Sequence, residues 1–306
     1  MSWLYLVEQL LNGLQWGLML FLLSAGLTLI LGIMNVINLA HGSLFMLGAY
    51  FTATMSEAIG GFWIAAAIAI VGVTVLGLVI ERLLFRRLYG RDHLTQVLCT
   101  FALILLANEG VSAIWGRSAL SVMMPKGLDG PVELATNLFF PSYRLLIIAV
   151  GIVVCIALYL VVNKTKGGMW LRAGAADSPM ARAMGVAVAA LFTLVFGAGA
   201  ALGALAGALL APLLSVQIGM GENVLILCFV VVVIGGIGSI RGALTGALLV
   251  GIVDTVGRGF LPMLLREIMS GAVASAIGPA LASVMIYILM AAILAVRPQG
   301  LFSARG

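Results

Sequence analysis

Charged residues are scarce in this sequence. Only 9% of its 306 residues are Asp, Glu, Lys or Arg, whereas a soluble domain carries about a quarter. None lies between Glu8 and Glu57, between Glu57 and Glu81, or between Arg182 and Glu222. Because one helix crosses a bilayer with about 20 apolar residues, these stretches must hold several crossings. The scarcity of charge excludes an ordinary water-soluble domain.

Cysteine is also scarce, and the sequence lacks the motifs of common enzymes. Cys99, Cys155 and Cys228 stand alone in apolar stretches, without the spacing of a disulfide framework or a metal site. No Gly-Lys dipeptide, His-Glu-x-x-His or Gly-x-Ser-x-Gly occurs, so a Walker A loop and two hydrolytic sites are excluded. We therefore expect no catalytic residue, no metal site and no cofactor in this chain.

The apolar runs that remain define the fold class. They are continuously apolar and do not alternate with period two, which favours membrane helices. We predict an all-α polytopic membrane protein with eight or nine transmembrane segments, in which residues 1–306 form a single transmembrane domain. The segments are 9–33, 41–57, 62–80, 95–115, 144–162, 190–213, 224–238, 242–258 and 281–297. The pairs 9–57 and 224–258 can each hide a broken or re-entrant helix.

The basic residues predict the orientation in the membrane. Residues 81–92 carry four arginines, and residues 164–182 carry four basic residues against one acid. Lys and Arg are retained on the cytoplasmic side, so both loops should be cytoplasmic and residues 116–143 should lie outside. With nine crossings the N-terminus is outside and the tail 297–306 is cytoplasmic. The net charge of +5 is thus a topology signal, and no nucleic-acid partner is expected.

A polar cluster follows the first apolar run. Asn35, Asn38, His41 and Ser43 fall within nine residues, beside Gly42. Such side chains are costly at membrane depth unless they find partners or face water, and transporters expose solute-binding groups at broken helices. These four residues are predicted to line the translocation path or a gate. The alternative is a hydrogen-bonded cluster between helices or a tight cytoplasmic turn.

A second stretch, the loop at about 164–189, is predicted to be a cytoplasmic coupling loop. Ser178 and Pro179 suit the N-cap and first turn of a short helix that ends near Gly185. A helix this short is marginal alone, so a surface that docks a cytoplasmic partner would explain it. The alternative is a solvated loop.

The third stretch is rich in glycine and resembles a nucleotide-binding loop only superficially. Gly235, Gly236, Gly238 and Gly242 surround the turn before Arg241, and small residues let membrane helices approach closely. A dinucleotide site needs a strand and a helix around the glycines, and here the surroundings are apolar membrane sequence. We predict helix packing for these glycines.

Acidic residues inside the apolar runs are few. Glu109 and Asp254 are the two that stand there, and both suit helix-end anchors. Ion-coupled carriers usually keep intramembrane carboxylates for coupling, so the scarcity argues against a single-chain secondary transporter. That class remains the alternative function.

Together these motifs resemble the permease subunits of ABC importers for branched-chain amino acids, of the leucine/isoleucine/valine type. The likeness covers nearly the whole length. The motifs are Gly26-Leu-Thr-Leu-Ile, Asn35-Val-Ile-Asn38-Leu-Ala-His41-Gly42, Met46-Leu-Gly48-Ala-Tyr50, Arg172-Ala173 through Asp177, Ala181 and Gly185-Val186, Gly235-Gly236-Ile-Gly238-Ser239 with Gly242, and Arg297-Pro-Gln-Gly-Leu-Phe.

The resemblance implies a heterodimer with a second related permease, two cytoplasmic ATPase subunits that hold ATP and Mg²⁺, and a periplasmic solute-binding protein, in a bacterial-type inner membrane. It implies no enzymatic role for this chain. Solutes would be branched-chain amino acids or related small amides and carboxylates. The implied ATPase-docking residues are Arg172, Ala173, Asp177, Ala181 and Gly185, and Gly42 and Gly48 join the packing glycines. Ser178-Pro179 departs from the charged residues that the motif would carry there.

Overall fold

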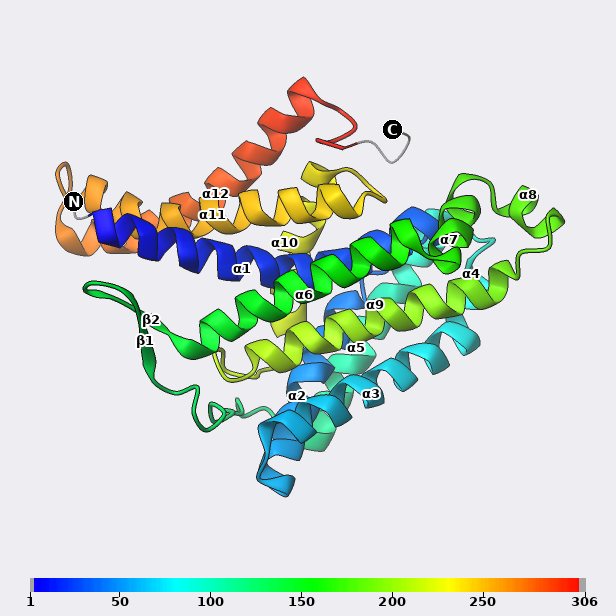
Figure 1. The fold of residues 1–306 in the computed structure, drawn as a ribbon, viewed down its shortest axis with the longest axis horizontal. Helices are drawn as coiled ribbons and strands as arrows, with labels where there is room; N and C mark the ends of the chain where they lie inside the picture. Colours follow the sequence, from blue (N-terminus) through cyan, green and yellow to red (C-terminus); the bar gives the residue numbers. More distant parts are fainter. Residues whose placement is uncertain (1–2, 303–306) are drawn as a thin grey trace. The chain divides into compact units, whose positions relative to one another are not determined.

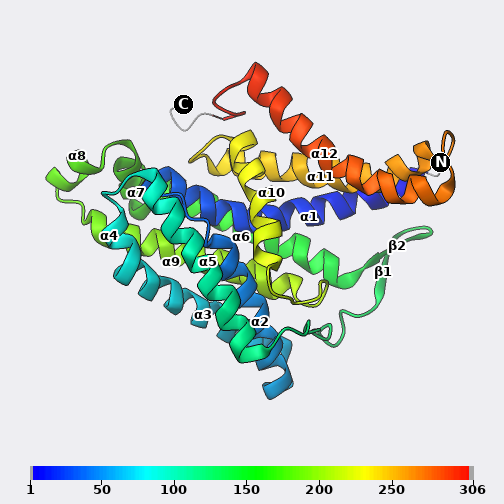
Figure 2. The same ribbon diagram turned by 180° about the vertical axis from the view of Figure 1, so that it is seen from behind.

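The computed structural model describes residues 3–302, and nearly all of its regular structure is helical. Its helices (Figures 1 and 2) are α1 Trp3–Leu29, α2 His41–Ile59, α3 Phe62–Ile80, α4 Arg86–Leu88, α5 His93–Trp115, α6 Ser142–Lys164, α7 Lys166–Ala176, α8 Ser178–Ala183, α9 Val188–Leu210, α10 Met220–Gly235, α11 Ile240–Leu265 and α12 Gly271–Val296. Two π-helices, Ile30–Met34 and Glu81–Phe85, extend α1 and α3. The all-α polytopic prediction is confirmed at this level. The predicted cytoplasmic tail falls partly outside the described residues, at 303–306.

The segment after α5 contains an element that was not predicted. In the segment 116–143, β1 (Pro131–Ala135) and β2 (Leu138–Pro141) form an antiparallel hairpin. Its turn contains Asn137 with φ of 66°, and Asn tolerates this left-handed region better than most residues. The hairpin adds a small sheet to an otherwise helical chain.

Seven helical segments in residues 3–302 are long and apolar enough to cross a membrane. Five of these spans correspond to α5, α6, α9, α11 and α12, and the other two extend α1 and α3 through their π-helices. The predicted segments 41–57 and 224–238 are the helices α2 and α10, but neither is among the seven. With 16 residues, α10 is about 24 Å long, short of the roughly 30 Å hydrocarbon core. The count of eight or nine crossings therefore stays a prediction.

The chain divides into two compact units, each built from separated segments. Unit 1 holds residues 1–24, 127–153 and 227–306, and unit 2 holds residues 25–126 and 154–226. Three of the four boundaries fall inside α1, α6 and α10, and the fourth, between residues 126 and 127, falls in the segment after α5. Each unit thus gathers helices that are distant in the sequence.

Unit 2 is centred on the packing of α2 against α3 and α9. Leu44, Val73, Ala200 and Ala204 form a buried cluster there. A Cβ atom at Gly48 would lie 2.6 Å from the Cα and the carbonyl oxygen of Ala204, closer than real Cβ contacts allow. Small residues thus set the crossing of α2 and α9.

Unit 1 contains the packed pair α11 and α12 and the N-terminal part of α1. Leu18, Phe140 and Ile148 form its buried cluster. On α11, the Arg258 guanidinium lies 2.7 Å from Asp254 Oδ1 and donates to Ser283 Oγ of α12 at 3.0 Å. Asp254, 6% exposed, is therefore held in an ion pair.

A buried carboxylate stabilises the end of α3. Glu81 is fully buried and accepts hydrogen bonds from the Tyr89 hydroxyl and, at 2.8 Å, from Thr193 Oγ1 of α9. The Arg86 guanidinium lies 3.7 Å from it. Asp92 then caps α5, and its hydrogen bonds from Thr95 lower the pKa of its carboxyl group. Both arrangements fix the segment 81–92, which the sequence predicts to be cytoplasmic.

Candidate functional site

The polar cluster lies at a break between two helices. After the π-helix Ile30–Met34, Asn35 adopts left-handed angles, φ 51° and ψ 36°, and α2 begins at His41. Asn is the residue type best able to take this conformation apart from Gly. The predicted segments 9–33 and 41–57 are thus separate helices joined by an irregular stretch, which is where the sequence predicts a discontinuity.

The side chains of the cluster differ in their exposure. Asn35 is exposed, whereas Asn38, His41 and Ser43 are buried, with exposed fractions of 1%, 0% and 7%. His41 packs so closely that a Cβ atom on Gly26 would lie 2.9 Å from its Nε2 atom. In this conformation Asn35 is the exposed member of the cluster, and the other three side chains are enclosed within the protein.

Asn38 is the unusual member of the cluster. Neither its amide nitrogen nor its side-chain oxygen has a hydrogen-bond partner within the described residues. An unpartnered buried polar group costs about 1–3 kcal/mol, and such costs are commonly retained at functional sites. Asn38 therefore fits a group that finds its partner in another conformation, as a gate residue would.

This geometry predicts opposite effects of Asn38→Leu on stability and on transport. The thermal unfolding temperature of the purified chain should rise by several degrees, because an unsatisfied amide is removed, while solute uptake falls. Gln96→Leu serves as the contrast: Gln96 is also buried, but its amide is hydrogen-bonded, and its loss should lower the unfolding temperature. Unchanged uptake in both Asn38→Leu and His41→Leu would favour a packing role for the cluster.

Gln96 itself supports the break, although the sequence reasoning missed it. Its Oε1 atom accepts a hydrogen bond from the Ile37 backbone N–H at 3.4 Å, and its Nε2 atom donates to the carbonyl oxygens of Leu88 and Arg91 at 3.2 Å. The side chain joins the break to the segment 81–92. A glutamine inside an apolar run is the signal that could have identified it.

The predicted coupling loop contains two helices. α7 begins after Thr165, whose hydroxyl accepts from the Gly168 N–H at 3.1 Å. α8 is capped by Asp177, whose Oδ1 accepts from the Met180 N–H at 2.9 Å. The predicted N-cap, Ser178, was therefore wrong by one residue, because the Ser178 hydroxyl instead donates to the Gly174 carbonyl at 2.7 Å. The helix was predicted to end near Gly185, and α8 does end at Ala183, shortly before Gly185 with its φ of 86°.

Most of the predicted docking residues are accessible. Arg172, Ala173, Asp177 and Gly185 are exposed, whereas Ala181 is buried and holds α8 in place. The sequence reasoning missed a set of large apolar side chains on the same two helices and the turn after them. These are Met169, Trp170, Met180 and Met184, with exposed fractions of 54%, 48%, 60% and 78%.

α7 also contacts the broken end of α1. Both α7 and α9 pack against the π-helix Ile30–Met34, which leads directly into Asn35 and the break. All of these elements belong to unit 2. A displacement of α7 would thus act directly on the segment that precedes the polar cluster.

The glycine-rich turn brings α10 and α11 together in unit 1. A Cβ atom on Gly242 would collide with the Gly235 carbonyl, and Gly236 and Gly238 have φ of 101° and 83°. The Phe302 N–H donates to the Gly235 carbonyl at 3.0 Å, which fixes the end of the described chain on this turn. The position of the glycines agrees with close helix packing.

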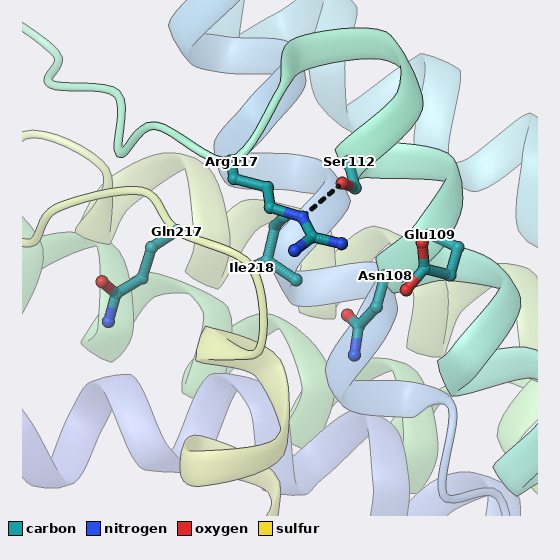
Figure 3. A pocket seen from close by; sticks show the side chains of 6 residues that line it. All are labelled: Asn108, Glu109, Ser112, Arg117, Gln217 and Ile218. Atoms are coloured by element: carbon teal, nitrogen blue, oxygen red, sulfur yellow. Dashed lines mark hydrogen bonds between the residues drawn. The ribbon is translucent and has the colours of Figure 1, made fainter.

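A cavity of about 320 Å³ lies elsewhere in unit 2, at the C-terminal end of α5 (Figure 3). Glu109 and Arg117 contribute charged groups to its lining. Backbone hydrogen bonds of 2.9 Å in both directions between Leu120 and Val216 join the segment after α5 to the segment before α10. The complete lining is Asn108, Glu109, Ser112, Arg117, Gln217 and Ile218.

Comparison with known proteins gives a consistent answer along the chain. Residues 9–294 match the family described as branched-chain amino acid transport system / permease component. The chain belongs to this family. The high-affinity branched-chain amino acid transport system permease protein LivH of Escherichia coli (strain K12) is 27% identical over 289 residues, which cover 88% of this chain and 91% of LivH.

Further relatives agree with this assignment. The permease protein BraD of Pseudomonas aeruginosa is 29% identical over 263 residues, which cover 82% of this chain and 86% of BraD. LivH of Salmonella typhimurium (strain LT2) is 26% identical, with 88% of this chain and 91% of that protein covered. No solved structure matches the chain.

The chain is therefore a multi-pass membrane permease of a branched-chain amino acid ABC transport system. The predicted family is confirmed by this match. In this permease, the predicted coupling segment and the predicted polar cluster both lie in unit 2. They are connected because α7 contacts the π-helix that precedes the cluster. The cavity at the end of α5 is a further feature that the sequence reasoning missed. Of its lining residues, only Glu109 was singled out in the sequence, as a helix-end anchor.

Proposed function

We propose that this permease is one of two related membrane subunits of an ATP-driven importer for branched-chain amino acids or related small amides and carboxylates. Two cytoplasmic ATPase subunits would bind and hydrolyse ATP with Mg²⁺, and a periplasmic binding protein would deliver the solute. The family match over residues 9–294 carries this proposal. We place the protein in a bacterial-type inner membrane, with residues 1–306 as one permease domain of eight or nine crossings.

We further propose that α7 and α8 are the segment on which an ATPase subunit docks. The two helices present the exposed Arg172 and Asp177 beside the exposed Trp170 and Met180. An apolar surface rimmed by charges is typical of a protein contact. The arginines of 81–92 and the basic residues of 164–182 support a cytoplasmic location for this surface by the positive-inside rule. In the proposed orientation the N-terminus is outside and the C-terminal tail is inside.

The transport cycle would be a population shift between two accessible states. ATP binding can favour one state only if the ATPases contact the two states differently. α7 is suited to transmit that difference, because it packs on the π-helix that leads to Asn35 and the buried Asn38. In this proposal the polar cluster acts as the gate, and the glycines at 42, 48 and 235–242 keep the helices in close contact.

The experiment that tests the importer is gentle extraction of the tagged chain from its native membrane, followed by mass spectrometry of the proteins that stay bound. We expect a second permease and ATPase subunits. The complex, placed in liposomes with a binding protein, should accumulate leucine only when ATP is supplied. Uptake by the chain alone under an ion gradient without ATP would instead establish the secondary transporter.

A further inference from the structure

The cavity at the end of α5 is lined by two side chains of opposite charge, Glu109 and Arg117. In Figure 3 the Glu109 side chain, from the last turns of α5, and the Arg117 side chain, from the segment just after α5, extend toward each other. Neither forms an ion pair within residues 3–302, although this chain does pair Arg86 with Glu81 and Arg258 with Asp254. The Arg117 Nε atom donates a long hydrogen bond of 3.4 Å to Ser112 Oγ.

A buried acceptor belongs to the same lining. The Asn108 side-chain nitrogen donates to Glu222 Oε1 at 2.7 Å, which fixes the orientation of the amide. The Asn108 Oδ1 atom is then buried and has no hydrogen-bond partner in the described part of the chain. Glu222 lies in the first turn of α10, where the helix dipole stabilises a carboxylate. Asn108 thus brings to the lining an oriented amide whose Oδ1 atom has no partner among the described residues.

We infer that this cavity binds the zwitterionic backbone of a small α-amino acid. Arg117 would take the carboxylate, which its planar guanidinium can bind through two hydrogen bonds. Glu109 and the Asn108 Oδ1 atom would take the ammonium group, and Ile218 offers apolar contact to the side chain. The inference rests on the proposed function, and it names the residues that would bind the proposed substrate.

The size and place of the cavity suit that ligand. About 320 Å³ lies at the lower end of the range of about 300–1,000 Å³ for small-molecule sites, so a single amino acid fits better than a peptide. α5 follows the predicted cytoplasmic segment 81–92, so its C-terminal end is predicted to face outside. A solute released by a periplasmic binding protein would meet this cavity on the receiving side.

The matched variants are Arg117→Gln and Glu109→Gln, each of which removes one charge from an exposed side chain. Lys126→Gln and Asp129→Asn make the same charge changes on exposed residues outside the lining. The purified importer complex, without binding protein, is equilibrated with radiolabelled leucine and challenged with leucinamide or 4-methylpentanoate. Leucinamide lacks the carboxylate and 4-methylpentanoate lacks the ammonium group, so each analogue reports on one half of the site.

We expect Arg117→Gln and Glu109→Gln to weaken leucine binding about tenfold or more, since a charge-assisted hydrogen bond is lost in each. Arg117→Gln should lose the preference for leucine over leucinamide, and Glu109→Gln the preference over 4-methylpentanoate. The two control variants should bind as the wild type does. The preference is the ratio of the affinities for leucine and for the analogue. It can therefore still be measured when a variant yields less folded complex.

Two results would overturn the inference while the proposed function stands. One is a wild-type complex that imports leucine with ATP, yet whose Arg117 and Glu109 variants bind leucine as the controls do. The other is a change only in the affinity for the binding protein, with analogue preference intact, which would make the cavity part of a docking surface. A complex that imports no leucine at all would contradict the proposed function itself, and the inference with it.

Discussion

Replacing Asp177 with Ala and Gly185 with Trp in one chain is expected to reduce ATP-driven leucine uptake to the background of empty vesicles, with the protein still inserted in the membrane. The loss of the Asp177 cap costs α8 about 1 kcal/mol, and this helix has only six residues. Tryptophan at φ of 86° is strained, and its ring would project from the surface, because nothing lies within 4 Å of a Cβ atom placed on Gly185. The measurement is uptake together with ATP hydrolysis by the complex.

A matched control is available in the segment predicted to lie on the opposite side. Gly127 has the same φ of 86° and equally open surroundings, and Asp129 lies two residues away. Asp129→Ala with Gly127→Trp should therefore keep normal uptake. Undiminished uptake in the Asp177 and Gly185 variant would refute the docking assignment, and equal loss in both variants would show that strain alone is responsible.

Replacing Gly48 with Leu is expected to destabilise the folded protein strongly and to lower its unfolding temperature. Even a Cβ atom would lie 2.6 Å from the Ala204 backbone, and backbone atoms cannot move aside as a flexible side chain can. α2 and α9 would have to separate along the central packing of unit 2. Overpacking a core typically costs about 1–3 kcal/mol or more, a large share of the 5–15 kcal/mol that stabilises a typical domain.

Fluorescence-detected size-exclusion chromatography with a thermal ramp measures this effect. Gly110→Leu on α5 is the control, because nothing lies within 4 Å of its Cβ position, and leucine favours a helix over glycine. The control should elute and melt as the wild type does. A Gly48→Leu protein that unfolds within a few degrees of the wild type would contradict the close α2–α9 crossing.

The helices themselves could be predicted well from the sequence, for a local physical reason. In lipid every backbone N–H and C=O group must be satisfied within the chain, so a long apolar run becomes a helix whatever its neighbours are. Each of the nine predicted segments coincides with a helix. The α7 helix was missed as an element because its exposed, charged sequence resembles a loop, and its stability comes from packing on α9 and on the π-helix.

The polar residues after the first apolar run also predicted the break at Asn35. Such side chains are costly inside an apolar run unless they find partners or face water. The sequence pattern could not indicate which of these side chains would be exposed. Asn38 is buried and Asn35, in the left-handed conformation, is exposed, and burial depends on the helices packed around the break. Of the four residues predicted to line the path or a gate, three are buried and one is exposed.

The sequence by itself determined that this is a helical membrane permease, because apolar length and local motifs depend on neighbours along the chain. Only the tertiary structure revealed the cavity between α5 and the segment before α10. Arg117 and Gln217 are far apart in sequence, and each alone is an ordinary exposed polar residue. Helix packing and the Leu120–Val216 backbone pairing bring them together, and no periodicity or composition encodes which distant side chains will share a pocket.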